Sequence, residues 1–270
     1  MFSKKIVINL EKKDDLVELE PLGDIHVGHK GFREDLYVKA VERVAKQDNR
    51  YTLFMGDQLD AITPYDKRFN PDTSVEHDID NQREKWQDLT QRLIDVQAKV
   101  KAKEYNEKIW GLLHGNHEYN IREITRPYIE NLFCKFNNID FLGSRAVIGL
   151  EVRHKNKILN QWTILAIHGT GGSRPETMFD HMKMNHYADV FLCGHSHQKR
   201  YQPEAVVDFD FATGKSYERE IHLVNTGTFC ETLIDNVDGY MDRKNKVILS
   251  SIGTATLSFD AYNGKIIGHI

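Results

Sequence analysis

The sequence is poor in cysteine: its 270 residues include only three, Cys134, Cys193 and Cys230, at wide spacing. An odd and scattered set of this kind argues against a disulfide framework and against a cysteine-ligated zinc site. Cys193 and Cys230 lie in apolar, strand-like runs, where free cysteines are usually buried. We therefore expect a reducing compartment, the cytoplasm.

Long apolar runs and a surplus of positive charge are also absent. No run of about 18 apolar residues occurs, so we expect no transmembrane helix and no membrane partner. The first ten residues become charged too early for a signal peptide and are expected to form a strand. The formal net charge is −4, which argues against the broad phosphate-binding surface of general nucleic-acid binders.

What the sequence does have is an ordinary globular composition, with 40% hydrophobic and 28% charged residues. Strand-like runs alternate with amphipathic segments, which is the pattern of an α/β protein. Strands are expected at 51–55, 109–113 and 189–193, and hairpins at 6–10 with 16–22 and at 146–152 with 158–167. Helices are expected at about 34–47, 80–103 and 176–185. A further helix is expected to begin at Thr125-Arg126-Pro127, with a buried face of Tyr128, Leu132 and Phe136.

We expect residues 1–270 to form a single domain of two packed mixed β-sheets flanked by helices. Residues 61–103 combine an irregular, proline-containing loop with a long helix. Together they form an insertion that acts either as a lid or as a plain surface segment. From about residue 199 the chain becomes β-rich, with further strands expected at 247–251, 256–259 and 265–270.

Five expected strands end in side chains of the kinds that bind metals. These are Asp24 and His26, Asp57, Asn116 and His117, His168, and His195 and His197. Each one alone has an ordinary explanation, such as a turn or a helix cap. Together they predict a metal site, because sites in α/β proteins form outside the carboxyl ends of strands. Mixed imidazole and carboxylate ligands suit Mn, Fe, Zn or Ni better than Ca or Mg.

The stretch Gly115-Asn116-His117-Glu118 concentrates this chemistry. The glycine allows a sharp turn and a close approach to a ligand. The asparagine offers a neutral oxygen, the histidine titrates near neutrality, and the glutamate is placed to orient that histidine.

Five motifs resemble those of the calcineurin-like metallophosphoesterase family and come in the family's order, over about residues 17 to 200. They are Asp24-Ile25-His26-Val27-Gly28, Gly56-Asp57-Gln58-Leu59-Asp60, Gly115-Asn116-His117-Glu118, His168-Gly169 and Gly194-His195-Ser196-His197. The resemblance implies a four-layer αββα sandwich. It also implies a hydrolase that cleaves phosphate esters with two divalent metal ions, Mn foremost and Fe, Zn or Ni as alternatives.

The resemblance also implies a role for each matching residue. One metal would be held by Asp24, His26, Asp57 and His197. The second would be held by Asp57, Asn116, His168 and His195, with Asp57 bridging. The pair would supply a metal-bound hydroxide that attacks phosphorus. His117 would protonate the leaving group, Glu118 would orient His117, and Asp60 would support the ligands. Four other histidines match no ligand position: His29, His114, His181 and His186.

The substrate class is less defined. The Asp-x-His-x-Gly form of the first motif resembles the repair-exonuclease branch of the family, which favours a phosphodiesterase acting on nucleic acid or nucleotides. Candidate phosphate-binding residues are Arg122, Arg174 and Arg200. A phosphomonoesterase and a catalytically silent binding scaffold are the alternatives. The oligomeric state stays open, with a homodimer among the options.

Overall fold

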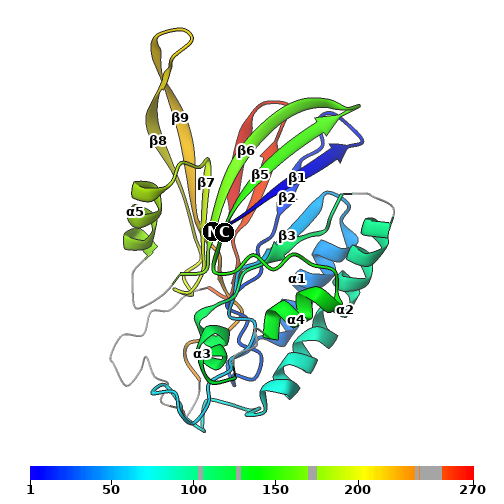
Figure 1. The fold of residues 1–270 in the computed structure, drawn as a ribbon, viewed down its shortest axis with the longest axis vertical. Coiled ribbons are helices and arrows are strands. Elements are labelled where there is room, and N and C mark those ends of the chain that lie inside the picture. The colour runs from blue at the N-terminus through cyan, green and yellow to red at the C-terminus, as the bar shows by residue number, and fades with distance from the viewer. Residues whose placement is uncertain (103–105, 126–128, 170–174, 235–236, 238–250) are drawn as a thin grey trace.

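Two mixed β-sheets stack face to face and helices lie on both outer sides, as Figure 1 shows for the computed structural model. The structure describes the whole chain except residues 103–105, 126–128, 170–174, 235–236 and 238–250. The expected strand 247–251 lies outside the described residues. The α/β class with two mixed sheets is as the sequence predicted.

The first sheet has six strands in the order β1-β5-β6-β7-β9-β8. In that order they are Phe2–Leu10, Arg145–His154, Lys157–Ile167, Val190–Cys193, Lys215–Asn225 and Arg200–Asp210. The hairpin expected at 146–152 with 158–167 is present as β5 and β6, which pair antiparallel. Strands β6, β7 and β9 run parallel to one another, so their carboxyl ends meet at one edge.

The second sheet has five strands in the order β13-β12-β2-β3-β4. In that order they are Lys265–His269, Thr256–Asp260, Val17–Leu19, Arg50–Phe54 and Ile109–Leu112. Strands β2, β3 and β4 are parallel and likewise end at one edge. A small pair, β10 (Gly227–Thr228) and β11 (Gly253–Thr254), lies apart from both sheets.

The described residues form five helices, which divide between the two outer faces (Figure 1). They are α1 (Glu34–Lys46), α2 (Ile79–Ala102), α3 (Asn116–Thr125), α4 (Ile129–Phe136) and α5 (Pro175–Asn185). Apolar residues of α1, α2 and α4 share a buried cluster with the five-stranded sheet. Those of α5 pack on the six-stranded sheet. A third cluster fills the space between the sheets, with Trp110, Tyr51 and Ile8 among its buried members.

The hairpin expected from 6–10 and 16–22 is wrong. Strand β1 pairs parallel with β5 in the six-stranded sheet, whereas β2 pairs with β3 and β12 in the other sheet. The polar stretch Lys12-Lys13-Asp14-Asp15 does form a turn, in which the Asp15 N–H donates to the Lys12 carbonyl at 3.3 Å, but this turn connects the two sheets and not two paired strands. Local turn signals do not reveal this, because the choice of sheet is decided by distant partners.

The expected face of the helix after residue 125 is also wrong. Thr125 ends α3, and α4 begins at Ile129. Leu132 is 46% and Phe136 86% exposed, while Phe133 is buried against Trp86 with ring centroids 4.3 Å apart. Packing against α2 thus sets the rotation of this short helix. Tyr128 lies outside the described residues.

Candidate metal centre

The side chains that follow the parallel strands converge at the edge where both sheets end. Among the described residues, three groups have ligand atoms that lie within 4.8 Å of one another, and the third, His26, Asp60 and His117, shares His26 with the first. The first group is Asp24, His26 and His197, and the second is Asp57, His168 and His195. All but His195 and His197 are buried, and these two are half-buried. The first two groups contain six of the seven residues for which the resemblance implies ligation.

Asp57 lies between the first two groups. Its Oδ2 atom is 3.2 Å from His168 Nε2 and 3.9 Å from His26 Nε2. Within the first group, His26 Nε2 lies 3.0 Å from His197 Nε2, and His197 Nε2 lies 3.4 Å from Asp24 Oδ1. A carboxylate in this position can contact both sets of imidazoles, which is the geometry required of a bridging ligand.

Asn116 supplies the seventh side chain. Its Oδ1 end lies 3.2 Å from His168 Nε2, and the same end lies 3.3 Å from Asp57 Oδ2 and 2.6 Å from His195 Nδ1. An amide oxygen facing a carboxylate oxygen and ring nitrogens is repelled unless a cation lies among them. Otherwise the amide turns its NH₂ toward these acceptors. The donor set therefore fits a metal ion, and the orientation of this amide depends on one.

The backbone at these positions is unusual. Asp24, His26, Asp57, His195 and His197 all have positive φ, between 49° and 67°. Residues other than glycine adopt this region at a cost of about 1–3 kcal/mol each, and such residues cluster at functional sites. The contacts around these loops must therefore hold the backbone of the five residues in this costly conformation.

Two glycines allow the loops to approach one another. A Cβ on Gly115 would lie 1.9 Å from Asp57 Oδ1, and one on Gly56 would lie 2.6 Å from His168 Nδ1. Gly56 also has a φ of +98°. Both motif glycines are thus required by the close packing of ligand-bearing loops, as the sequence suggested for Gly115.

The electrostatics favour positive charge at the centre. Burial opposes ionisation of Asp57, but His168 and His117 hold the pKa of its carboxyl well below the usual range. Burial likewise opposes charge on His168, yet Asp57 and Asp24 raise its pKa to about 10. A buried carboxylate needs a compensating charge. A proton on His168 supplies this positive charge for Asp57, and a bound metal cation would supply it as well.

His117 lies beside the centre with both ring nitrogens engaged. Its Nδ1 donates to the Asp60 carbonyl, and its Nε2 faces Arg68 Nη1 at 2.8 Å. Its ring meets that of His26 edge-on, with centroids 4.5 Å apart. Burial lowers the pKa of His117 to about 4, so the ring is neutral at pH 7.

Glu118 does not orient His117 as expected. Its carboxylate accepts hydrogen bonds from the backbone N–H groups of Asp57, Leu59 and Gly115, at 3.1, 3.0 and 3.1 Å. The Asp60 carbonyl holds His117 instead. Glu118 fixes the loop after β3 to the start of α3. It therefore holds the backbone of these two segments, and not the His117 side chain as expected.

Asp60, for which the resemblance implies a supporting role, lies beside the ligand His26. Its Oδ1 is 3.8 Å from His26 Nδ1, on the opposite side of that ring from His197. Burial raises the pKa of Asp60 to about 7. Thr228 was not among the residues predicted from the sequence, yet its hydroxyl donates to the Asp24 carbonyl at 2.8 Å and so anchors the first loop.

Arg68 was not among the sequence candidates either. It belongs to the irregular part of the 61–103 insertion, yet it contacts His117 and comes within 3.2 Å of the Asn116 amide. No local pattern separates it from its neighbours Lys67 and Phe69. Only the path of the loop across the centre reveals it.

The arginines chosen from the sequence are placed differently. Arg200 on β8 forms an ion pair with Glu176 of α5 and donates to Gln202 at 2.9 Å. Arg122 on α3 lies 5.8 Å from the centre of the Tyr119 ring. Arg174 lies outside the described residues. Phosphate binding by these three stays a prediction.

None of the groups includes His29, His114, His181 or His186, for which the resemblance implies no ligand position. His29 contacts Cys230 Sγ through Nδ1 at 3.1 Å. His181 and His186 lie on and just after α5, the first exposed and the second half-buried. His114, which directly precedes Gly115, is buried.

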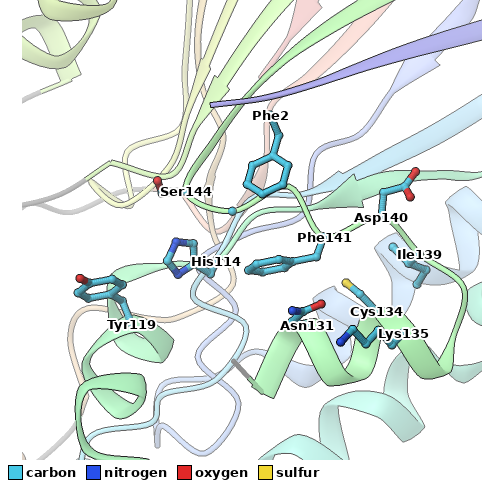
Figure 2. Close-up of a pocket in the computed structure, with 11 residues that line it drawn as sticks. Phe2, His114, Tyr119, Asn131, Cys134, Lys135, Ile139, Asp140, Phe141 and Ser144 are labelled. Atoms are coloured by element: carbon cyan, nitrogen blue, oxygen red, sulfur yellow. The ribbon is translucent and has the colours of Figure 1, made fainter. Parts of the chain in front are cut away.

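His114 also lines a cavity of about 630 Å³ beside the centre (Figure 2). Its ring lies between those of Tyr119 and Phe141, at centroid distances of 5.6 and 5.9 Å. Phe2 closes one side, and the polar side chains of Asn131 and Lys135 reach the wall from α4 (Figure 2). The cavity thus combines aromatic faces with hydrogen-bonding groups.

Two curated relatives share sequence with the chain. It is 20% identical over 265 residues to the DNA polymerase II small subunit of Methanothermobacter thermautotrophicus, covering 83% of this chain and 49% of the relative. It is 31% identical over 97 residues to the DNA polymerase II small subunit of Thermoplasma acidophilum, covering 34% of this chain and 19% of the relative. The chain therefore spans about half or less of the length of these relatives. No protein-family model matches the chain.

A solved structure gives a weaker likeness. It is a conserved uncharacterized protein, a predicted phosphoesterase, from Streptococcus pneumoniae TIGR4, at 12% identity and a TM-score of 0.37. The match covers 91% of this chain and 84% of that one. Likeness at this level does not establish a shared function.

Among the helices of the described residues, none is long and apolar enough to cross a membrane. The ordered motifs, the two-sheet fold and the His/Asp groups at the strand ends agree with one another. The chain is a metallophosphoesterase-like α/β protein that resembles the calcineurin-like family.

Proposed function

We propose that the protein is a two-metal phosphoesterase, and within that class a phosphodiesterase acting on nucleic acid or nucleotides. The observation that carries the proposal is the position of Asp57, with one carboxylate oxygen 3.2 Å from His168 and 3.9 Å from His26. That arrangement joins two donor groups through one shared ligand.

The proposed ligand assignment follows the geometry. The first metal would be held by Asp24, His26, Asp57 and His197, and the second by Asp57, Asn116, His168 and His195. When bound, two divalent ions would lower the pKa of a water and stabilise charge on the phosphate oxygens. Manganese is the first choice, with Fe, Zn or Ni as alternatives.

His117 is proposed to deliver a proton to the departing oxygen. Its Nδ1 is held by the Asp60 carbonyl, so Nε2, which lies 2.8 Å from Arg68 Nη1, is the nitrogen proposed to face the substrate. Nε2 carries no proton before substrate binds, so it must gain one from solvent. General acid catalysis of this kind contributes about 10²–10⁴-fold.

A nucleic-acid substrate is supported by two observations. Both curated relatives are named as small subunits of a DNA polymerase. The cavity beside Gly115 offers the rings of Tyr119, Phe141 and His114, and aromatic faces bind bases by stacking. Arg122, Arg174 and Arg200 remain candidates for contacts to flanking phosphates.

The organisation of the chain is part of the proposal. Residues 1–270 form one domain, since the tail strands β8 and β9 complete one sheet and β12 and β13 the other. Helix α2 of the insertion packs in the core through Trp86 and Leu93, whereas the loop before it covers the centre through Arg68. The lid is thus the loop and not the helix. We place the protein in the cytoplasm.

The test is hydrolysis of bis-p-nitrophenyl phosphate against p-nitrophenyl phosphate, with Mn²⁺ added. We expect the diester to be cleaved with the higher kcat/KM. A clear preference for the monoester would replace the proposal with a phosphomonoesterase.

A second candidate is a silent subunit of a larger assembly. It is favoured by the names of the two relatives, each a polymerase small subunit of which this chain covers half or less. Absence of hydrolysis of every phosphate ester by protein with two metals bound would select this candidate. A homodimer, if formed, would show in light scattering.

A further inference from the structure

Arg68 is placed over the candidate centre by a loop that carries none of the motifs. Its Nη1 lies 2.8 Å from His117 Nε2 and 3.2 Å from the amide of Asn116. Its side chain is 17% exposed. One N–H group of this guanidinium therefore lies where the proposed proton donor and a proposed ligand meet.

The other edge of the guanidinium is fixed. Asp66 accepts from Arg68 Nε at 3.0 Å and from Nη2 at 2.6 Å, and its Oδ1 also accepts the Arg68 backbone N–H at 2.8 Å. Asn120 on α3 donates to the same carboxylate at 3.3 Å. Paired contacts of this kind between arginine and a carboxylate are strong and directional. Asp66 thus orients Arg68 so that Nη1 points at the centre.

The chemistry of the contact defines what Nη1 can do there. An arginine only donates, so His117 Nε2 must be the acceptor, consistent with a proton on Nδ1 that bonds the Asp60 carbonyl. His117 Nε2 is a neutral acceptor, and an oxygen of a bound phosphate is a charged one. Hydrogen bonds to charged acceptors are shorter and about twice as strong, so a phosphate at the centre would draw Nη1 away from His117.

We propose that Arg68 binds a non-bridging oxygen of the substrate phosphate, moving Nη1 from His117 Nε2 to that oxygen. The proposal rests on the proposed function and names the phosphate-binding residue of the same site. Arginine suits this role because its charge is permanent and its planar group can keep Asp66 while it contacts phosphate. The same movement frees His117 to face the leaving oxygen.

A plainer role would be to balance the carboxylates around it. Burial opposes the charge on Arg68, but Asp66, Asp57 and Asp60 together raise its pKa. A pure counter-charge would act on folding and metal content, and would not affect the affinity for phosphate once two metals are bound. The two roles therefore predict different results for the same substitution.

The test uses the Mn²⁺-loaded chain with Arg68→Met and Arg68→Lys. Arg92→Met is the matched control, because Arg92 lies half-exposed on α2 and pairs with Glu42 at 2.6 Å. Affinity for inorganic phosphate is measured by calorimetry, metal content by mass spectrometry, and kcat and KM with bis-p-nitrophenyl phosphate. We expect Arg68→Met to weaken phosphate binding about 10- to 100-fold, as for loss of a hydrogen bond to a charged group. Arg68→Lys should weaken it less, and metal content should stay near two.

Unchanged phosphate affinity in Arg68→Met, or loss of metal from it, would overturn the inference even if the wild type hydrolyses diesters. If the wild type binds phosphate through Arg68 but hydrolyses nothing, the inference stands and the proposed hydrolysis fails. If the metal-loaded wild type binds no phosphate, both fall.

Discussion

The carboxylate of Glu118 accepts the backbone N–H of Asp57 at 3.1 Å, so the first turn of α3 holds the loop that carries the proposed bridging ligand. The same carboxylate accepts the N–H groups of Leu59 and Gly115. One buried side chain thereby ties two motif loops together. We therefore expect substitution of Glu118 to lower the free energy of unfolding.

Glu118→Ala should lower the free energy of unfolding by about 3 kcal/mol or more, because each buried N–H left without a partner costs about 1–3 kcal/mol. Glu118→Gln keeps one acceptor oxygen, so its free energy of unfolding should lie between those of the wild type and Glu118→Ala. Urea unfolding measures both, with Glu84→Ala, on the exposed side of α2, as the control. An unfolding midpoint unchanged in Glu118→Ala would contradict the assigned role.

Metal content should distinguish the shared ligand from an unshared one. Asp57→Asn removes the charge that lies between His26 and His168, so both sites should weaken and metal content should fall below one ion per chain. Asp24→Asn changes a proposed ligand of the first metal alone and should leave about one ion. Mass spectrometry after Mn²⁺ reconstitution and dialysis gives the numbers. Equal losses in the two variants would mean that Asp57 does not bridge.

His117→Asn should lower kcat by about 10²–10⁴-fold, since it removes the proposed general acid. Metal content should stay near two ions per chain, because no ligand is removed. The comparison uses a dinucleoside phosphate, whose sugar leaving oxygen needs a proton, beside a metal assay on the same preparation. Loss of metal in this variant would show that His117 is a ligand instead.

Glu130 on α4 should make stability depend on pH. Burial raises the pKa of its carboxyl from 4.5 to about 7, and in the described part of the chain its Oε1 has no hydrogen-bond partner. The folded state therefore holds this proton more tightly than the unfolded state. Its contribution is fully present below pH 4.5 and is lost as the pH rises through about 7, by up to about 3 kcal/mol.

Glu130→Gln should flatten this dependence and be more stable than the wild type at pH 8. Urea unfolding of both proteins at pH 5 and pH 8 measures the difference, and Glu84→Gln controls for a general change of charge. A wild type and a Glu130→Gln variant with parallel pH profiles would contradict the assignment.

The strand ends could be read from the sequence because each combines an apolar run with a motif that contains glycine. Gly115 indicated a loop that approaches a neighbour closely, and the structure supplies the contact with Asp57 that requires it. The helices at 34–46 and 79–102 followed from periodicity alone. These features are local, so the sequence contains them.

What could not be predicted depends on distant partners. The stretch 12–15 resembles a hairpin turn, yet β1 and β2 belong to different sheets. Glu118 was assigned to the nearest histidine, whereas its partners include Asp57 and Leu59, about sixty residues away. Arg68 lies on a loop without a period, and only the fold brings it to His117.

The positive φ angles at five of the proposed ligands restrict how this centre can vary. Valine, isoleucine and threonine are strongly disfavoured there, while asparagine, aspartate, histidine and glycine are tolerated. The backbone at these positions therefore tolerates only a few residue types, and most of them have side chains that can bind metals. A mutational library at Asp24, His26 or Asp57 should therefore yield folded variants chiefly with exchanged donors, and few with the donor replaced by a β-branched side chain.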